Sequence, residues 1–464
     1  MGSAIRTEGT KDGARIGATI ELSTFIAQLD GSRIPDSVMH HAKRALVDWL
    51  GVTLAGSTAP SVDALRAIAS YVGAGRRATV LGRGWEAGIL VAVLTNGFSA
   101  HVLDYDDTYN PARTTIHGSA PVWPVIMALS EQQPVSGNEA LAAFVAGFET
   151  EVRVALAAGP GHYEAGYHVT GTVGHLGAAA AAANLMQLDP VLVANALGAA
   201  GTQAAGLKSV YGSSGKPLHP GKAAMDGLLA ALLAREGFTA STSILEHERG
   251  FLHVLSPSPD VGLVTKDLGN HWMLPGNGFK PYACGSLTHP TIDAIIALRA
   301  RHGVDAKEIA AIEATVNNYV SWVTGRSSPT TGLEGKFSIF HCAAVAAVDG
   351  AARVRQFDDA RVMAPDVVEM RKRVTIVVDD SLPKDGASVT LVLTDGRRLT
   401  CDIVHNRGTP ERPLSDDELE EKFLDLATSR IGGVAAREVV QTCWGLESYR
   451  DLGSIARLCR VPEE

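Results

Sequence analysis

Hydrophobic positions recur at helical spacing through the first half of the chain. One apolar stripe with the i, i+3, i+4, i+7 repeat of an amphipathic helix consists of Leu22, Phe25, Ile26 and Leu29. Pro35 suits a first helical turn and Gly56 suits a helix end, so a second helix is expected between them. Further helices are expected over residues 62–72, 89–103, 121–131, 137–157, 173–188, 190–205 and 222–236. The alanines at 178–183 have small side chains on every side, which predicts a central helix packed by its neighbours.

The pattern changes after about residue 275. Residues 373–378 and 388–393 are rich in β-branched side chains, and a turn at Asp395 and Gly396 leads to a strand over 398–404. Residues 309–320 also read partly as a strand, and 339–348 as a helix. From Ser415 onward, acidic residues mark a new helix start, and these C-terminal helices can return to the first domain. We expect a mainly α protein with a large all-helical domain over 1–270, a smaller α/β domain over 275–405, and C-terminal helices over 408–464.

Composition indicates the size of the core and argues against some kinds of partner. With 464 residues, of which 46% are hydrophobic and 20% charged, the chain can bury a sizeable core in about two or three domains. Its net charge of −9 and its lack of a basic stripe argue against nucleic acid as a partner. An anionic small molecule remains compatible with this charge, because a few cations in a cleft dominate the local field.

The cysteines and the N-terminal stretch indicate the cellular compartment of the protein. Five cysteines are scattered without a CxxC or Cys/His ligand spacing, so neither a disulfide scaffold nor a structural zinc site is expected. The N-terminal stretch has no apolar signal core, and no apolar run is long enough to span a bilayer. These features predict a soluble, cytoplasmic protein that does not bind a membrane.

One polar segment, HVLDYDDTYNPARTTIHGSAPVWP over residues 101–124, interrupts the apolar helices. Asp104, Asp106 and Asp107 fall within four positions of it. A solvated acidic loop is one interpretation. The segment lacks the Glu/Lys mixture of a charged surface, however, apolar sequence flanks it, and three prolines fix its backbone. A costly polar loop between apolar elements is a candidate site.

Three further positions combine polar side chains with unusual surroundings. His168 lies among glycines before the alanine-rich stretch, where a satisfied core histidine is the alternative to a site. Lys216 lies in GSSGKP, which lacks the Walker spacing but places a lysine on a rigid loop before the helix expected from residue 222. Such a place suits an anion, and Lys222 offers a second cation. Lys280 lies in apolar, Gly/Pro-rich sequence near the expected domain boundary, where substrate clefts tend to form.

The region after Lys280 adds weaker candidates. Cys284 and His289 lie close by, but spacing assigns no base to a cysteine nucleophile. Tyr319 and Lys336 are candidate lining residues. The sequence contains no GxGxxG after a strand, no HExxH and no GxSxG, which removes the strongest signals for dinucleotide cofactors, metalloproteases and α/β-hydrolases.

Six stretches, in this order, resemble the MmgE/PrpD family: HVLDYDDTY, GYHVTGTVGHLGAAAAAA, GKPLHPGKAAMDG, FKPYACGSLTHPTIDA, EGKFSIFHCAAVAAVDG and PLSDDELEEKF. That family includes 2-methylcitrate dehydratases, cis-aconitate decarboxylases and an iminodisuccinate epimerase. The similarity runs from about residue 22 to the C-terminal helices. Together the stretches are specific to the family but not to one activity.

The resemblance implies a fold, an assembly and a set of site residues. It implies a helical domain interrupted in sequence by a smaller α/β lid domain, a homodimer, and no metal, iron–sulfur cluster or nucleotide cofactor. The residues that match the family's catalytic positions are Asp104, His117, His168, Lys216 and Lys280. Thr108 and Tyr319 match substrate-binding positions, and Arg113 and His289 are added as substrate-binding candidates.

Two departures separate this chain from decarboxylase-like members. Where those read close to HPATHPSGA, this chain reads NPARTTIHGSA, which moves His117 a few residues later and adds Arg113. Arg113 would bind an extra carboxylate of the substrate or form ion pairs with the neighbouring aspartates. Decarboxylase-like members also carry a histidine five residues after the lid lysine, whereas this chain has Gly285 there and His289 further on. Both changes argue against calling the chain simply a cis-aconitate decarboxylase.

The family's reactions share the movement of a proton at carbon next to a carboxylate. Lys216 and Lys280 are expected to hold carboxylates, His117 or His168 to act as general acid/base, and Asp104 to orient a histidine or a substrate hydroxyl. The first hypothesis is a lyase that dehydrates or decarboxylates a di- or tricarboxylic acid. The second is an epimerase or isomerase that uses the same residues. The third is a non-catalytic paralogue that binds a small acid or a protein, and it predicts that these side chains do not converge.

Overall fold

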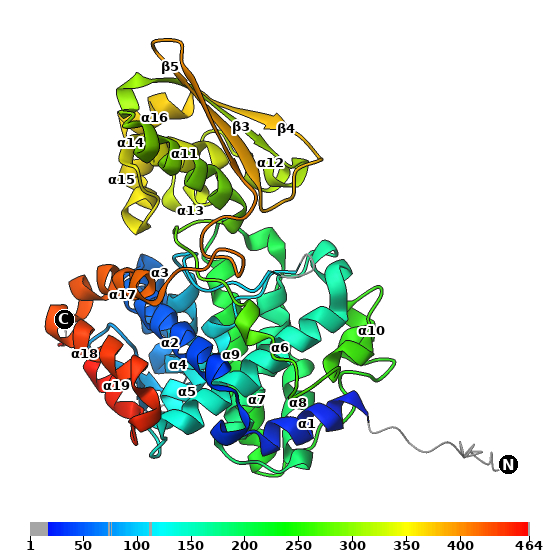
Figure 1. Ribbon diagram of the computed structural model, residues 1–464. Helices are drawn as coiled ribbons and strands as arrows, with labels where there is room; N and C mark the ends of the chain where they lie inside the picture. Colours follow the sequence, from blue (N-terminus) through cyan, green and yellow to red (C-terminus); the bar gives the residue numbers. More distant parts are fainter. Residues whose placement is uncertain (1–16, 73–74, 76, 111–113, 463–464) are drawn as a thin grey trace.

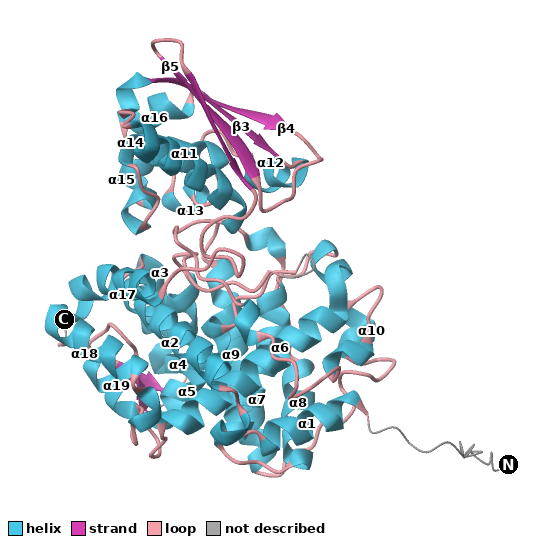
Figure 2. Cartoon of the chain, in the orientation of Figure 1, coloured by secondary structure: helices cyan, strands magenta, loops and turns pink. Residues whose placement is uncertain are grey.

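A computed structural model describes residues 17–72, 75, 77–110 and 114–462. Figure 1 shows a large helical body with a smaller α/β part above it, and the C-terminal helices lie beside the N-terminal ones in the larger body. The strands concentrate in the smaller part (Figure 2). The protein is mainly α, as the hydrophobic pattern predicts. Within the described ranges, no helix combines the length and the apolar character needed to cross a membrane.

The helical body is built from helices close to those predicted for the first half of the chain, joined by three from the C-terminus. Their bounds are α1 Ala18–Gln28, α2 Asp36–Gly56, α3 Pro60–Ile68, α4 Ile89–His101, α5 Ser119–Ser130, α6 Gly137–Glu164, α7 Val169–Leu185, α8 Pro190–Gly201, α9 Gly215–Arg235, α10 Phe251–Leu255, α17 Asp416–Ile431, α18 Gly433–Trp444 and α19 Gly453–Leu458. A short antiparallel ribbon pairs β1 (Arg77–Thr79) with β2 (Glu86–Gly88).

Two helices begin four or more residues earlier than the sequence predicted. Helix α7 begins at Val169 rather than 173, and α9 begins at Gly215 rather than 222. Pro217 lies in the first turn of α9, where a backbone N–H has no helical acceptor, so proline loses no hydrogen bond there. The Gly/Pro run therefore starts this helix instead of preceding it. Lys216 lies in the first turn of α9 and not on a loop before it.

Helix α7 is the centre of the body and packs against α5, α6, α8 and α9. The alanines at 178–183 are fully buried, which confirms the predicted central helix. Helices α4 and α9 also approach closely, because glycines face each other across the contact. A Cβ atom on Gly221 of α9 would lie 2.4 Å from the Leu94 carbonyl oxygen, closer than two such atoms can pack.

The α/β part contains a four-stranded sheet in the order β4–β3–β5–β6. Strand β3 pairs with β4 in parallel and with β5 antiparallel, and the predicted turn at Asp395 and Gly396 joins β5 to β6. Helices α11 and α14 pack on one face of the sheet. The bounds are α11 His289–His302, β3 Ile309–Val316, α12 Asn318–Thr324, α13 Gly332–Gly335, α14 Ile339–Asp349, α15 Asp359–Val362, α16 Pro365–Arg371, β4 Val374–Val378, β5 Ala387–Leu393 and β6 Arg398–Ile403.

The strand predicted over 309–320 is too long. Strand β3 ends at Val316, and the Asn317 side chain accepts a hydrogen bond from the Tyr319 backbone N–H at 3.0 Å. Asparagine in this role caps a helix, so α12 starts here. Tyr319 therefore lies on a helix rather than on a strand.

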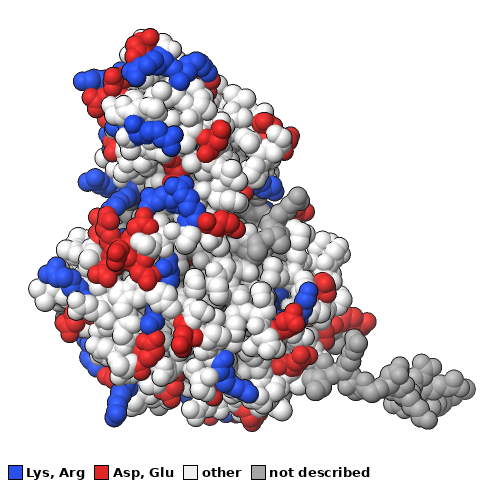
Figure 3. All heavy atoms as spheres, in the orientation of Figure 1, with Lys and Arg blue, Asp and Glu red and all other residues white. Residues whose placement is uncertain are grey.

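Exposed ion pairs join the two parts at the surface. Arg353 of the α/β part pairs with Glu421 and Asp425 of α17, and Arg407 pairs with Glu418 of the same helix. On the face drawn in Figure 3, charged side chains of both signs gather at the level where the two parts meet. Each exposed ion pair contributes only about 0–1 kcal/mol to stability. These contacts therefore orient the two parts but stabilise their association only weakly.

The Gly221→Ala variant tests the close contact between α4 and α9. The added methyl group must push the two helices apart, and we expect a loss of about 1–3 kcal/mol in the free energy of unfolding, measured by urea denaturation. Gly433→Ala on α18 is the matched control, because the nearest atoms to its Cβ would lie 3.5 Å away or more. Equal stability of the two variants would contradict the contact.

Candidate active site

A cavity of about 930 Å³ lies between the helical body and the α/β part. Its wall includes most of the residues proposed from the sequence, namely Asp104, Thr108, His117, Lys216, Lys280, His289 and Tyr319. His168 is buried close to this wall, 2% exposed. Arg113 lies outside the described residues. The candidate side chains therefore converge on one cavity instead of being scattered over the fold.

Asp104 binds two buried lysines. Its Oδ1 atom accepts hydrogen bonds from Lys216 Nζ at 3.0 Å and from Lys280 Nζ at 2.6 Å. Lys280 also donates to the Asp104 carbonyl oxygen at 3.1 Å. The Asp104 backbone has a φ of 51°, a left-handed conformation that non-glycine residues adopt at a cost and that is typical of functional sites. Its Oδ2 atom is buried and has no hydrogen-bond partner among the described residues.

Within this triad the opposite charges act against the effect of burial. Burial opposes ionisation of Asp104, but Lys216 and Lys280 outweigh burial and hold the pKa of this carboxyl well below its usual value. Burial lowers the pKa of Lys216. At Lys280 burial also favours the neutral amine, but Asp104 and Asp106 outweigh it and raise the pKa. With both amines protonated, as their ion pairs with Asp104 favour, the triad carries a net charge of +1, which attracts an anion.

A third buried lysine fixes the backbone around the triad. Lys422 of α17 donates hydrogen bonds to Asp48 Oδ1 at 2.6 Å and to the carbonyl oxygens of Tyr105 and Lys280 at 2.7 and 2.9 Å. Helix α17 packs against α2, so the C-terminal segment lies on the helical body. A single side chain from near the C-terminus thus ties the loop of the first half to the segment that carries Lys280.

Lys336 is a fourth buried lysine. The sequence suggested it as a lining residue, but its Nζ donates to the carbonyl oxygens of Leu103 and Ala283 at 2.5 and 2.7 Å. Burial lowers the pKa of Lys336 to about 8, and Asp104 acts in the opposite direction. Lys336 therefore binds the acidic loop from the side of the α/β part, and it is not among the residues that line the cavity.

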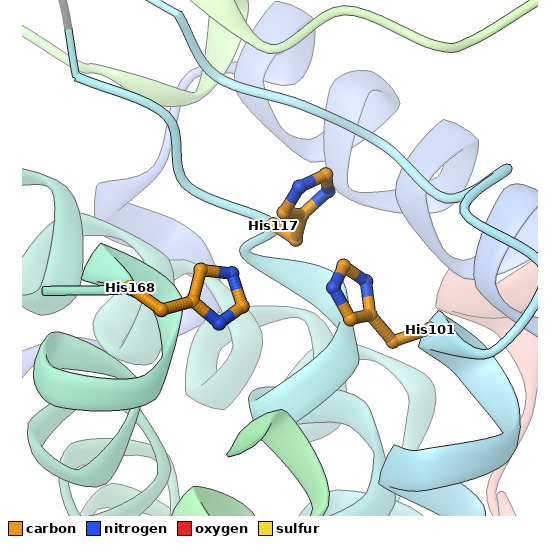
Figure 4. A group of neighbouring side chains, drawn as sticks. All are labelled: His101, His117 and His168. Carbon is orange, nitrogen blue, oxygen red and sulfur yellow. The ribbon is translucent and has the colours of Figure 1, made fainter. Parts of the chain in front are cut away.

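Three buried histidines form a cluster next to the triad (Figure 4). We call His101, His117 and His168 the histidine cluster. His101 ends α4, His117 lies just before α5, and His168 is the N-cap residue of α7. The ring centroids lie 4.5, 5.7 and 6.4 Å apart. Burial lowers the pKa of each imidazole, so the neutral form prevails at neutral pH.

The carboxylate that holds His101 and His117 is Asp106, whereas Asp104 holds lysines. Asp106 Oδ2 lies 2.7 Å from His101 Nδ1 and 3.4 Å from His117 Nδ1. The His117 Nδ1 also lies 2.9 Å from the Asp107 carbonyl oxygen and 3.4 Å from Thr108 Oγ1. Two aspartates only two positions apart thus serve two different groups of side chains.

Sequence reasoning missed Lys422 and two histidines of this site. It assigned no role to His101 or to His219, whose Nδ1 lies 2.9 Å from His168 Nδ1. Both belong to stretches that carry the family resemblance, HVLDYDDTY and GKPLHPGKAAMDG. That location was the only available signal, because no spacing rule shows which ring nitrogens of distant histidines meet.

Aromatic and basic side chains surround the outer part of the cavity. The Tyr319 hydroxyl donates to the Tyr163 hydroxyl at 3.2 Å, which joins α12 to α6 across the cavity. Lys384 and Lys208 lie over these two rings, at 3.8 and 3.6 Å from their centroids. These cations add to the positive field that an anionic ligand meets on entry.

His289 and Cys284 lie at the base of α11. His289 Nε2 is 3.1 Å from the Cys284 carbonyl oxygen, and His289 contributes to the cavity wall. The Cys284 thiol is fully buried, with its Sγ 3.2 Å from Thr288 Oγ1. This packing gives His289 a place beside a ligand, whereas the cysteine has a structural contact.

Comparison with known proteins covers nearly the whole chain. Residues 20–263 match the model of the MmgE/PrpD N-terminal domain, and residues 282–446 match that of the MmgE/PrpD C-terminal domain. The cis-aconitate decarboxylase of Aspergillus terreus is 27% identical over 480 residues, which cover 97% of this chain and 97% of the relative. The cis-aconitate decarboxylase-like protein oryM of Aspergillus oryzae is 28% identical, over 97% and 98%. The human cis-aconitate decarboxylase is 28% identical, over 96% and 95%.

The Lys336→Met variant tests the buried ammonium group. The pKa of Lys336 is about 8 in the folded protein and about 10.4 in an unfolded chain. Between these values the unfolded chain keeps a proton that the folded protein has released, so raising the pH favours the folded state. Relative to the variant, the wild type should gain about 1.4 kcal/mol of stability per pH unit from about pH 8 to pH 10. Urea denaturation at several pH values measures this, and a constant difference would contradict it.

Proposed function

Because the chain belongs to the MmgE/PrpD family, we propose that it is a lyase that dehydrates or decarboxylates a small di- or tricarboxylic acid. The reaction moves a proton at carbon next to a carboxylate, and the protein's own side chains perform it. The observation that carries the proposal is the convergence of Lys216 and Lys280 on Asp104 at the cavity wall. The names of the curated relatives support the decarboxylation branch.

The two lysines supply the binding site for a carboxylate. An ammonium group has three N–H donors. Lys216 uses one of them on Asp104, and Lys280 uses two, one on the side chain and one on the carbonyl oxygen of Asp104. The remaining donors are available to a substrate carboxylate. In a buried site such donors stabilise negative charge far better than in water and need no reorganisation as the charge grows. They therefore favour the enolate-like state that follows loss of a proton or of carbon dioxide.

His117 is placed to move the proton. It lines the cavity, it is neutral, and its Nδ1 is held by the Asp107 carbonyl and by Asp106. Its Nε2 atom is thus the one that reaches a substrate. In decarboxylation the C–C electron pair stays on carbon as carbon dioxide leaves, and a proton that His117 Nε2 takes from a water molecule passes to that carbon, leaving hydroxide. In dehydration a C–H proton is removed, and the leaving hydroxide takes up a proton and departs as water.

The unpaired Oδ2 atom of Asp104 gives the site a second recognition element. A buried carboxylate oxygen without a partner is costly, and a substrate hydroxyl or a water molecule that donates to it removes that cost. Thr108 lies at the same wall. A hydroxy acid satisfies this oxygen directly, which supports the dehydration branch beside decarboxylation.

Proton NMR in deuterated buffer tests the reaction class. The panel contains methylcitrate, citrate, cis-aconitate, iminodisuccinate and related β-substituted acids. We expect either a vinylic signal from a saturated acid, which indicates dehydration, or a terminal methylene signal and carbon dioxide from cis-aconitate, which indicates decarboxylation. Deuterium wash-in without a new product would replace the lyase with an epimerase. No change in any acid would contradict the proposal for these substrates.

The Lys216→Met variant tests the carboxylate site. Removal of one donor to a developing anion typically lowers the rate by about 10²–10³-fold, and we expect kcat/KM on the identified acid to fall by this factor. Lys222→Met is the matched control on the same helix, because that side chain is half-exposed and pairs with Asp226. Wild-type turnover by Lys216→Met would show that the triad is not the site.

A further inference from the structure

The three rings of the histidine cluster share one pattern of contacts. In each ring Nδ1 is occupied, by a carboxylate in His101 at 2.7 Å, by a backbone carbonyl in His117 at 2.9 Å and by another imidazole in His168 at 2.9 Å. The Nε2 atoms of His101 and His168 are buried and have no hydrogen-bond partner within the described residues. Among the described residues, the contacts of the His117 ring with Thr108 and with the Asp107 carbonyl both involve Nδ1, and His117 lines the cavity. In the tautomer in which His168 Nδ1 donates to His219, each of the three rings carries an unused lone pair on Nε2.

Histidines that bind metals show this same pattern. A ligating imidazole almost always donates its other N–H to a carboxylate, a backbone carbonyl or a comparable acceptor, which fixes the ring and its tautomer. The contact of Asp106 with His101 and that of the Asp107 carbonyl with His117 are of this kind. Because an unpaired buried nitrogen is costly, a ligand that binds all three also relieves that cost.

The dimensions of the cluster also fit a small cation. One ring nitrogen from each histidine lies within 4.8 Å of those from the other two. A tetrahedral ion with metal–nitrogen bonds of about 2.0–2.1 Å places imidazole centroids roughly 5 Å apart and their nitrogens roughly 3.3 Å apart. The observed centroid distances of 4.5, 5.7 and 6.4 Å lie around this value. Metal binding requires the ring nitrogens to approach from within 4.8 Å to roughly 3.3 Å of one another.

We propose that His101, His117 and His168 form a binding site for one divalent cation of the Zn²⁺, Co²⁺ and Ni²⁺ class. Imidazole nitrogens suit these borderline ions, whereas Mg²⁺ and Ca²⁺ prefer oxygen ligands. His117 lies at the cavity wall, so the fourth coordination position opens toward the cavity. A water molecule or a carboxylate of the substrate class fills that position.

The charges around the cluster set the expected strength of binding. Asp104 and Asp106 carry negative charge, and Lys216 and Lys280 carry positive charge. These contributions nearly cancel, so the imidazoles rather than the surrounding field determine the affinity. A bound ion adds charge to a buried site and draws an anion to its fourth position.

Occupancy by such an ion inhibits the lyase, and this consequence rests on the proposed function. The ion takes the Nε2 lone pair of His117, the atom that proton transfer requires. The site is therefore an inhibitory one and not a cofactor site. Its affinity decides whether the cellular metal supply regulates the enzyme.

Cobalt binding to the full chain, freed of metal by a chelator, tests the site without any substrate. We expect about one Co²⁺ per chain by equilibrium dialysis, and intense visible absorption typical of four-coordinate Co²⁺. X-ray absorption fine structure of the bound cobalt should show three imidazole nitrogens at about 2.0–2.1 Å. No stoichiometric binding, or coordination by fewer than three imidazoles, would overturn the proposal.

Two variants and a control locate the ion. His101→Gln removes a ligand, and Asp106→Asn removes the carboxylate that holds it, which should weaken Co²⁺ binding by about 10–100-fold. His175→Gln is the control, because His175 is buried in α7 and pairs with Asp226 outside the cluster. Circular dichroism verifies folding, and if His101→Gln does not fold, Asp106→Asn and the wild-type absorption spectrum decide. An equal loss in His175→Gln would refute the assignment.

Activity gives a separate readout once an acid is identified. Turnover should fall in step with Zn²⁺ occupancy and return when a chelator removes the ion. Full activity with the ion bound would refute the inhibitory role. The cobalt measurements need no turnover, so a failure of the lyase proposal and a failure of the metal site give different results.

Discussion

Four buried lysine ammonium groups fix the acidic loop between α4 and α5. Lys216 and Lys280 bind the Asp104 side chain, Lys336 binds the Leu103 carbonyl, and Lys422 binds the Tyr105 carbonyl. Each ammonium group loses its hydration on burial, a loss of several kcal/mol that only well-placed acceptors offset. The loop supplies these acceptors in three consecutive residues. The left-handed backbone of Asp104 is tolerated because all four lysines hold the chain around it.

The same constraint brings distant parts of the chain to one cavity. Lys216 comes from the first turn of α9, Lys280 from the segment between the two parts, Lys336 from the α/β part, and Lys422 from α17. The helical body cannot complete the site alone, because Lys336 comes from the α/β part and lies 233 residues along the chain from the Leu103 carbonyl that it binds. The exposed ion pairs at the junction are weaker and add orientation to this buried link.

Asp104 and Asp106, two positions apart on the loop, bind side chains of different kinds. Asp104 binds lysines, which gives a positive site for a carboxylate, while Asp106 binds histidines, which gives oriented neutral imidazoles. Close packing of the helical body brings the second group together. Helices α7 and α9 begin at neighbouring points, so that His168 at the start of α7 meets His219 near the start of α9. Small residues in these helices permit the approach.

The sequence by itself determined the helical first half, the β5–β6 hairpin and seven of the residues that line the cavity, because periodicity, turn residues and motif stretches are local properties. Even there, Pro217 moved the start of α9 and Asn317 ended β3 early. Only the tertiary structure decided which side chains meet. Lys216 and Asp104 are separated by 112 residues, and His168 and His219 by 51. Hydrogen-bond partners at such separations are chosen by the packing of whole helices, which no local pattern encodes.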